Sequence, residues 1–261
     1  MAIRTIDDIK LQDIAVAIQG KDGGGTMTVD QMPTRIEQNL QSKAVLDSVI
    51  DGSITSFESD VTDMRNNIFS NYTNLESCNL RNVTALSSYA FLGCSSLVSI
   101  NAPNAISINE KALASCSNLR TIDFENVMVI GQYAFYRSGL RNLYAPSTIT
   151  LASNSFFQAY NVTRLFFPNV EEIGSYSFAY CSRLSTIVLH KRANLQNSNI
   201  LNDGCPAIIY VKPEDLSWYS TATNWSTLYA QDRIKSIEDL TGDDLAWYQE
   251  QLARYPIEEA S

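Results

Sequence analysis

The chain has 261 residues, of which 45% are hydrophobic, and a formal net charge of −9. This acidic balance argues against a nucleic-acid partner, because phosphate binding needs clustered lysine and arginine. The sequence contains no run of about 18 apolar residues and no amino-terminal secretory signal, so we expect neither membrane insertion nor export by that route.

The first 40 residues are predicted to form a helical amino-terminal module. Residues 5–20 place isoleucines on one side and acidic residues on the other, as an amphipathic helix does. A second short helix is expected over residues 29–40, with Pro33 tolerated in its first turn. Three glycines separate the two helices, and they lack the lysine of a phosphate-binding loop.

Residues 41–211 carry a repeat. An apolar anchor residue recurs in steps of 22 residues, with one step of 21, and other apolar columns keep the same step. A unit this short cannot bury a core alone, so successive turns must stack into a solenoid. The anchors are Phe69, Phe91, Leu113, Phe135, Phe156, Phe178 and Ile200.

One unit shows how each turn is built. Strand alternation directs Ile100 and Ala102 inward and Ser99 and Asn101 outward, and Pro103 then ends the strand. The first such strand is expected over residues 54–58 and the last over residues 207–211. The fold class predicted from these patterns is a β-rich repeat solenoid with turns of about 22 residues.

Several motifs give the repeat a family resemblance. The sequences Ile-Gly-Gln-Tyr-Ala-Phe at residues 130–135 and Ile-Gly-Ser-Tyr-Ser-Phe at residues 173–178 resemble BspA-like leucine-rich repeats, as does the stretch at residues 90–97. The resemblance implies a leucine-rich repeat rod over more than half of the chain. It departs at Leu113, where the phenylalanine is absent, and after Phe135, where one residue is missing.

A second resemblance concerns the two ends of the chain. The pattern Leu-Gln-Asp-Ile-Ala-x-Ala-Ile at residues 11–18, followed by Met32-Pro33-x-x-Ile36, is similar to the amino-terminal module of tail-associated proteins of phages and prophages of Gram-positive bacteria. The segment from Ile209 to residues 234–237 resembles the closing segment of phage-borne repeat proteins. The amino-terminal module either caps the solenoid or docks it to a tail component.

Residues 212–261 are predicted to close the solenoid. Trp218, Tyr219 and Trp225 are expected to lie across the last turn, because an open solenoid end exposes strand edges and apolar side chains. A final amphipathic helix is expected after the acidic pair at residues 243–244. Its apolar face would contain Leu245, Tyr248, Leu252 and Tyr255.

The five cysteines are expected to act as small buried hydrophobic residues. Three of them share one repeat column, and no Cys-x-x-Cys pair provides the spacing of a zinc site. We therefore expect no metal and no cofactor. The cysteines are Cys78, Cys94, Cys116, Cys181 and Cys205.

No catalytic set accompanies the polar residues, and the sequence predicts that the protein is not an enzyme. The single histidine, His190, lacks a nucleophile elbow or an obvious acid partner. The carboxylates Asp123, Glu125, Glu171 and Glu172 suit a glycosidase by residue type, but a regular rod offers them no deep pocket. Asn82, Asn104, Asn126 and Asn169 share one column and are expected to bond the backbone of the neighbouring turn.

The candidate binding surface lies on the outward positions of three successive strands. Apolar side chains there, flanked by polar ones, would form a patch of the kind that marks an interface. The alternative is that the carboxy-terminal helix covers this patch. Its residues are Asn142, Tyr144, Arg164, Phe166, Thr186 and Val188.

These observations predict a non-enzymatic binding or structural module of a phage or prophage tail, located in the virion and assembled in the host cytoplasm. Its partners would be other tail proteins or a polysaccharide or protein of the host cell surface, with a homo-oligomer as a further option. The alternative is a bacterial leucine-rich repeat surface protein or adhesin. A glycosidase is a third hypothesis.

Overall fold

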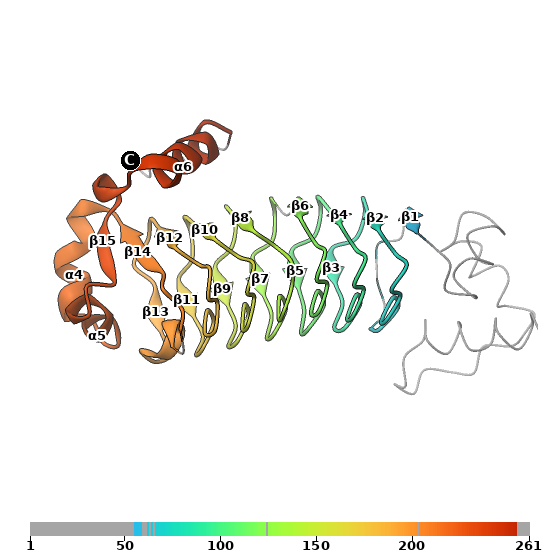
Figure 1. The fold of residues 1–261 in the computed structure, drawn as a ribbon, viewed down its shortest axis with the longest axis horizontal. Helices are drawn as coiled ribbons and strands as arrows, with labels where there is room; N and C mark the ends of the chain where they lie inside the picture. Colours follow the sequence, from blue (N-terminus) through green and yellow to red (C-terminus); the bar gives the residue numbers. More distant parts are fainter. Residues whose placement is uncertain are drawn as a thin grey trace, which may run out of the picture.

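The computed structural model describes residues 55–254, apart from residues 59–61, 63, 65, 124 and 203. These residues form a rod of stacked turns that ends in a group of short helices (Figure 1). The helical module predicted for residues 1–40 and the end of the tail from residue 255 lie outside the described residues.

One long side of the rod is a face of parallel strands, which we call the strand face. It consists of two sheets, with strand orders β1-β2-β4-β6 and β15-β14-β12-β10-β8. The strands are β1 Ser56–Glu58, β2 Ser77–Asn79, β4 Ser99–Asn101, β6 Thr121–Asp123, β8 Asn142–Tyr144, β10 Arg164–Phe167, β12 Thr186–Leu189, β14 Ile208–Val211 and β15 Ile234–Ser236.

A second face holds six two-residue strands, all parallel, in the order β13-β11-β9-β7-β5-β3. Each residue pairs with its counterpart one turn away, so the predicted solenoid with turns of about 22 residues is confirmed. The strands are β3 Ala85–Leu86, β5 Ser107–Ile108, β7 Val129–Ile130, β9 Thr150–Leu151, β11 Glu172–Ile173 and β13 Asn194–Leu195.

The core between the two faces is built from stacked columns. The anchor rings lie on one another, with the Phe135 and Phe156 ring centroids 4.9 Å apart and nearly parallel. Buried Cys94 donates from Sγ to the carbonyl of Phe69, and the same contact joins Cys116 to Phe91. The expectation that the cysteines behave as small core residues is confirmed, since all five are free and buried.

The asparagine column after the strands bonds the backbone of the preceding turn, as predicted. The side-chain amide of Asn104 donates to the carbonyl of Arg81 at 2.6 Å, and Asn126 donates to Pro103 at 2.8 Å. In the same way, the side-chain amide of Asn169 donates to the carbonyl of Pro146 at 2.8 Å. These bonds satisfy carbonyls where the strands end, so this column has a structural role.

The turn that lacks one residue marks the division of the strand face into two sheets, between β6 and β8. Gly139 lies in its corner, where its amide donates to the carbonyl of Cys116 at 2.9 Å. A Cβ atom on Gly139 would lie 2.0 Å from the carbonyl oxygen of Ser117. Only glycine allows the two backbones to approach this closely.

The carboxy-terminal end of the rod is capped by aromatic residues, as predicted. Tyr219 donates from its hydroxyl to the carbonyl of Lys191 at 2.9 Å, and the Trp225 indole donates to Ala193 at 2.6 Å. Both rings are buried, so they cover the last turn, and their donors pair with backbone carbonyl groups at its edge. The elements of this cap are η2 Asn199–Leu201, η3 Pro213–Asp215, α4 Leu216–Thr221, α5 Trp225–Ala230 and η4 Ile237–Asp239.

The strand predicted over residues 207–211 is present as β14, but it is not the last strand, because β15 extends the sheet by one more. Ile234 pairs with Ile209, and Ile234 is buried against the solenoid core. After β15 the chain forms helix α6, Gly242–Arg254, which packs on the strand face. Across the described residues, no helix has the length and apolar character needed to cross a membrane.

We predict that Gly139→Ala lowers the free energy of unfolding by about 3 kcal/mol, since the added methyl group meets a fixed backbone oxygen. Urea denaturation of the full chain measures the effect. Gly204→Ala is the matched control, because no atom lies within 4 Å of its Cβ position and only its positive φ of 79° is costly. The free energy of unfolding of this control should fall by about 1 kcal/mol. Equal losses in both variants would show that the shortened corner relaxes.

Candidate functional site

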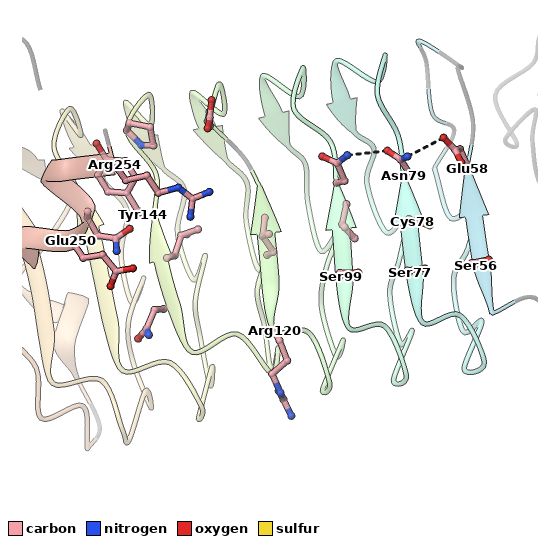
Figure 2. Close-up of a pocket in the computed structure, with 18 of the residues that line it drawn as sticks. Ser56, Glu58, Ser77, Cys78, Asn79, Ser99, Arg120, Tyr144, Glu250 and Arg254 are labelled. Carbon is pink, nitrogen blue, oxygen red and sulfur yellow. Dashed lines mark hydrogen bonds between the residues drawn. The ribbon is translucent and has the colours of Figure 1, made fainter. Parts of the chain in front are cut away.

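The strand face is open over its amino-terminal turns, where its outward side chains are polar. These positions carry Ser56, Glu58, Ser77, Asn79, Ser99 and Asn101, while the residue between each pair is buried. The amide of Asn79 donates to Glu58 Oε1 at 3.0 Å, and the amide of Asn101 donates to Asn79 Oδ1 at 3.0 Å. In-register pairing therefore produces a ladder of side-chain hydrogen bonds along the rod (Figure 2).

This polar surface is the floor of a groove of about 890 Å³. The carboxy-terminal half of α6 forms one wall, with Trp247, Glu250, Gln251 and Arg254. Figure 2 shows Glu250 and Arg254 beside Tyr144, at the end of the groove away from Glu58. We call this feature the strand-face groove.

The groove combines several kinds of recognition groups. Its floor offers serine hydroxyls and asparagine amides, its wall adds Glu250 and Arg254, and Tyr144 and Trp247 supply aromatic surface. Such a mixture can hydrogen-bond an extended polar ligand that lies across the strands. Of the aromatic lining residues, Tyr144 and Trp247 lie at the α6 end, whereas Phe57 is a buried residue of β1.

The surface patch predicted from the sequence lies under α6. Phe166 and Val188 are fully buried because they pack with Leu240 and Tyr248, and Thr186 is 1% exposed. Of the two alternatives drawn from the sequence, the structure shows the covering helix. Asn142 and Tyr144, at the edge of the patch, belong to the lining of the strand-face groove.

Polar contacts hold α6 in this position. Asp244, in its first turn, accepts hydrogen bonds from Arg164 Nε and from Thr186 Oγ1, the latter at 2.6 Å. The two predicted patch residues Arg164 and Thr186 therefore act as anchors for the helix. The contact is directional and partly shielded from water, which strengthens it relative to an exposed ion pair.

His190 is a second anchor for α6. Its Nε2 lies 2.8 Å from the hydroxyl of Tyr248, and its ring packs against Phe166 with the ring centroids 5.0 Å apart. Burial, with a smaller contribution from Lys212, lowers the pKa of His190 to about 4. The imidazole is therefore neutral at pH 7 and stabilises the docked helix.

The two carboxylate pairs considered for glycoside hydrolysis lie on different parts of the rod. Glu125 lines the strand-face groove, whereas Glu171 pairs with Lys191 at 3.4 Å on the exposed surface. The side chain of Asp123 lies outside the part of the chain that the structure describes. Within the described part of the chain, no three histidine, cysteine, aspartate or glutamate side chains are grouped as metal ligands.

The sequence reasoning did not identify the α6 wall of the groove. Strand alternation placed Asn101 on the outward face, and a covering carboxy-terminal helix was one of two alternatives for the neighbouring patch, but the groove between that helix and the amino-terminal strands was not predicted. Asp244 carries the signal for this position, because it lies in the first turn of the helix and pairs with Arg164.

Comparisons with known proteins agree with this geometry. The profile of the BspA type Leucine rich repeat region matches in six copies, over residues 49–163 and 106–216. No curated protein sequence matches the chain.

The similar solved structures are repeat proteins of low sequence identity. A leucine-rich repeat protein from Bacteroides ovatus has a TM-score of 0.50 and 17% identity, over 59% of this chain and 43% of that one. The T. pallidum leucine rich repeat protein has a TM-score of 0.45 and 19% identity, over 60% and 67%. The pneumococcal vaccine antigen PcpA has a TM-score of 0.49 and 16% identity, over 64% and 41%. The matched region thus spans less than half of the first and third of these proteins.

We predict that stability falls as the pH is lowered from 7.5 to 5, by about 1–2 kcal/mol through His190. In the folded chain its pKa is about 4, against an ordinary value of 6.5. Between these values the unfolded chain binds more protons, so acidification favours unfolding.

Urea denaturation at both pH values measures the effect. His190→Gln keeps a neutral polar side chain beside Tyr248 and should lose this part of the pH dependence. An unchanged pH dependence in the variant would contradict the assignment to His190.

Proposed function

The chain belongs to the BspA-type leucine-rich repeat family, and from this premise we propose that it is a non-enzymatic binding module of a phage or prophage tail. In this role the rod presents the strand-face groove to a component of the host envelope or to another virion protein. The alternative is the same binding role in a bacterial leucine-rich repeat surface protein.

The observation that carries the binding role is the open polar half of the strand face. Exposed Glu58 and Asn101 lie two turns apart and are linked through Asn79 on the turn between them, so their hydrogen-bonding groups are fixed relative to one another. A preorganised surface loses little conformational entropy when a ligand binds. The groove formed with α6 widens this surface at one end.

Support for the tail location comes from the sequence. The motif at residues 11–18, with Met32-Pro33-x-x-Ile36 after it, resembles tail-associated proteins. The repeat family suits a tail and a cell surface equally well. A partner such as a host polysaccharide or protein suits either location.

Support for a non-enzymatic role comes from the site chemistry. His190 is neutral at pH 7 and contacts Tyr248 and Phe166, so its position is explained by helix docking. The groove is lined mainly by polar surface, and binding of an extended ligand accounts for this lining.

We predict that the double variant Asn79→Ala/Asn101→Ala binds the target bacterium at least fivefold more weakly than the wild type, because it removes two rungs of the groove floor. Fluorescently labelled protein and intact cells of the bacterium that carries the gene, measured by flow cytometry, provide the test. Asn194→Ala is the matched control, an exposed strand asparagine on the other face. Wild-type binding by the double variant would exclude the groove as the binding surface.

The tail location has a separate test. After prophage induction of the same bacterium, gold-labelled antibody against the chain should decorate phage tails in electron micrographs of the lysate. Label found only on bacterial envelopes would contradict the tail location and favour the surface-protein alternative. Either result leaves the binding test of the groove unchanged.

A further inference from the structure

The corners between the short strands and the strand face carry a second regular surface. Six successive corners each contain two residues with positive φ, four positions apart, so both positions recur from turn to turn. The first position is occupied in successive turns by Asn67, Tyr89, Lys111, Tyr133, Asn154 and Tyr176. The second is occupied by Asn71, Gly93, Ser115, Arg137, Gln158 and Tyr180.

Bonds between turns impose this backbone conformation. The amide of Tyr89 donates to the carbonyl of Glu110 at 2.8 Å, and the amide of Asn154 donates to Ser175 at 2.9 Å. Glycine and asparagine adopt positive φ most readily, whereas for a bulky residue it costs about 1–2 kcal/mol. Tyr133, at φ 54°, and Tyr176, at φ 56°, therefore occupy positions that disfavour tyrosine.

The tyrosines at these corners line up with other aromatic rings in a strip along the rod. Tyr133 contacts Tyr136 and Phe157, with ring centroids 5.9 and 6.0 Å apart, and Phe157 contacts Tyr180 at 5.2 Å. Tyr176 and Tyr180 are 36% and 39% exposed. We call this strip the aromatic ridge, and it consists of Tyr89, Tyr133, Tyr136, Phe157, Tyr176 and Tyr180.

Polar side chains separate the rings along the rod. Lys111 lies between Tyr89 and Tyr133, with Nζ 5.1 and 5.5 Å from the two ring centroids. Asn154 occupies the same position between Tyr133 and Tyr176. The column thus alternates aromatic and polar residues, and the residues of the ridge are distinct from those that line the strand-face groove.

The spacing of the tyrosines indicates the class of ligand. Tyr89, Tyr133 and Tyr176 are two turns apart, which places them roughly 10 Å from one another along the rod. This step is close to the length of the disaccharide repeat in an extended β-1,4-linked polysaccharide, where every second sugar presents the same face. Tyrosine rings can stack on those faces while Lys111 and Asn154 reach the hydroxyl groups between them.

We infer that the aromatic ridge is a binding site for a neutral, extended β-1,4-linked polysaccharide, a second site that rests on the proposed binding function. Neutral chains are favoured because the net charge of −9 repels polyanions. The ridge presents a row of separate tyrosine rings, which suits a sugar chain better than a folded protein surface.

The test compares two hexasaccharides of glucose by isothermal titration calorimetry with the full chain. Cellohexaose is extended and long enough to span the roughly 20 Å from Tyr89 to Tyr176, whereas maltohexaose is curved. Wild-type protein should bind cellohexaose at least tenfold more tightly than maltohexaose. Equal affinity for both, or no binding of cellohexaose, would overturn the inference.

The double variant Tyr133→Asn/Tyr176→Asn separates binding from structure. Asparagine accepts positive φ, so the variant should unfold at the same or a higher temperature than the wild type and yet bind cellohexaose at least tenfold more weakly. Tyr229→Asn, at a 39% exposed tyrosine of α5, is the control and should leave binding unchanged. A lower unfolding temperature with unchanged binding would assign the ridge a structural role.

The two proposed sites can fail independently. The groove variant Asn79→Ala/Asn101→Ala should retain cellohexaose binding, because its substitutions lie on the strand face. If labelled protein binds cells while cellohexaose does not bind, the ridge inference fails and the proposed binding module stands. If cellohexaose binds but no cells are labelled, the groove proposal fails and the ridge remains.

Discussion

Every turn of the solenoid depends on in-register parallel pairing, which sets each residue beside its counterpart one repeat away. The pairing of Ser99 with both Ser77 and Thr121 is one example. Because the register is fixed, one side-chain contact becomes a column of contacts. The stacked phenylalanines, the cysteine bonds to carbonyls and the asparagine bonds at the strand ends are three results of the same constraint.

The periodic part of the fold could be predicted from the sequence because the same type of residue recurs at the same position in successive turns. Anchors such as Phe69 and Phe91 recur at one step, and their burial follows from that step. The contact of α6 with the strand face occurs once, through Asp244 and His190, so no recurrence reveals it. The sheet division at Gly139 was visible only as a missing residue.

The candidate site was predictable to the same extent. The polar outward positions, including Asn79 and Asn101, followed from strand alternation, but the groove also needs a wall that only the tertiary structure supplies. Two tyrosines of the ridge, Tyr133 and Tyr176, stand in the family motifs at residues 130–135 and 173–178. Both have a positive φ, a conformation that disfavours tyrosine. This property of the backbone cannot be read from the spacing of the residues.

The buried cysteines have a consequence for the environments in which the rod remains intact. Burial raises the pKa of the Cys94 thiol to about 12 and that of Cys205 to about 11, so almost no thiolate is present at pH 7. All five thiols are free, and no disulfide supports the stacked turns. A fold held by packing and backbone bonds alone is indifferent to the surrounding redox potential, and it keeps one covalent form in reducing and in oxidising surroundings.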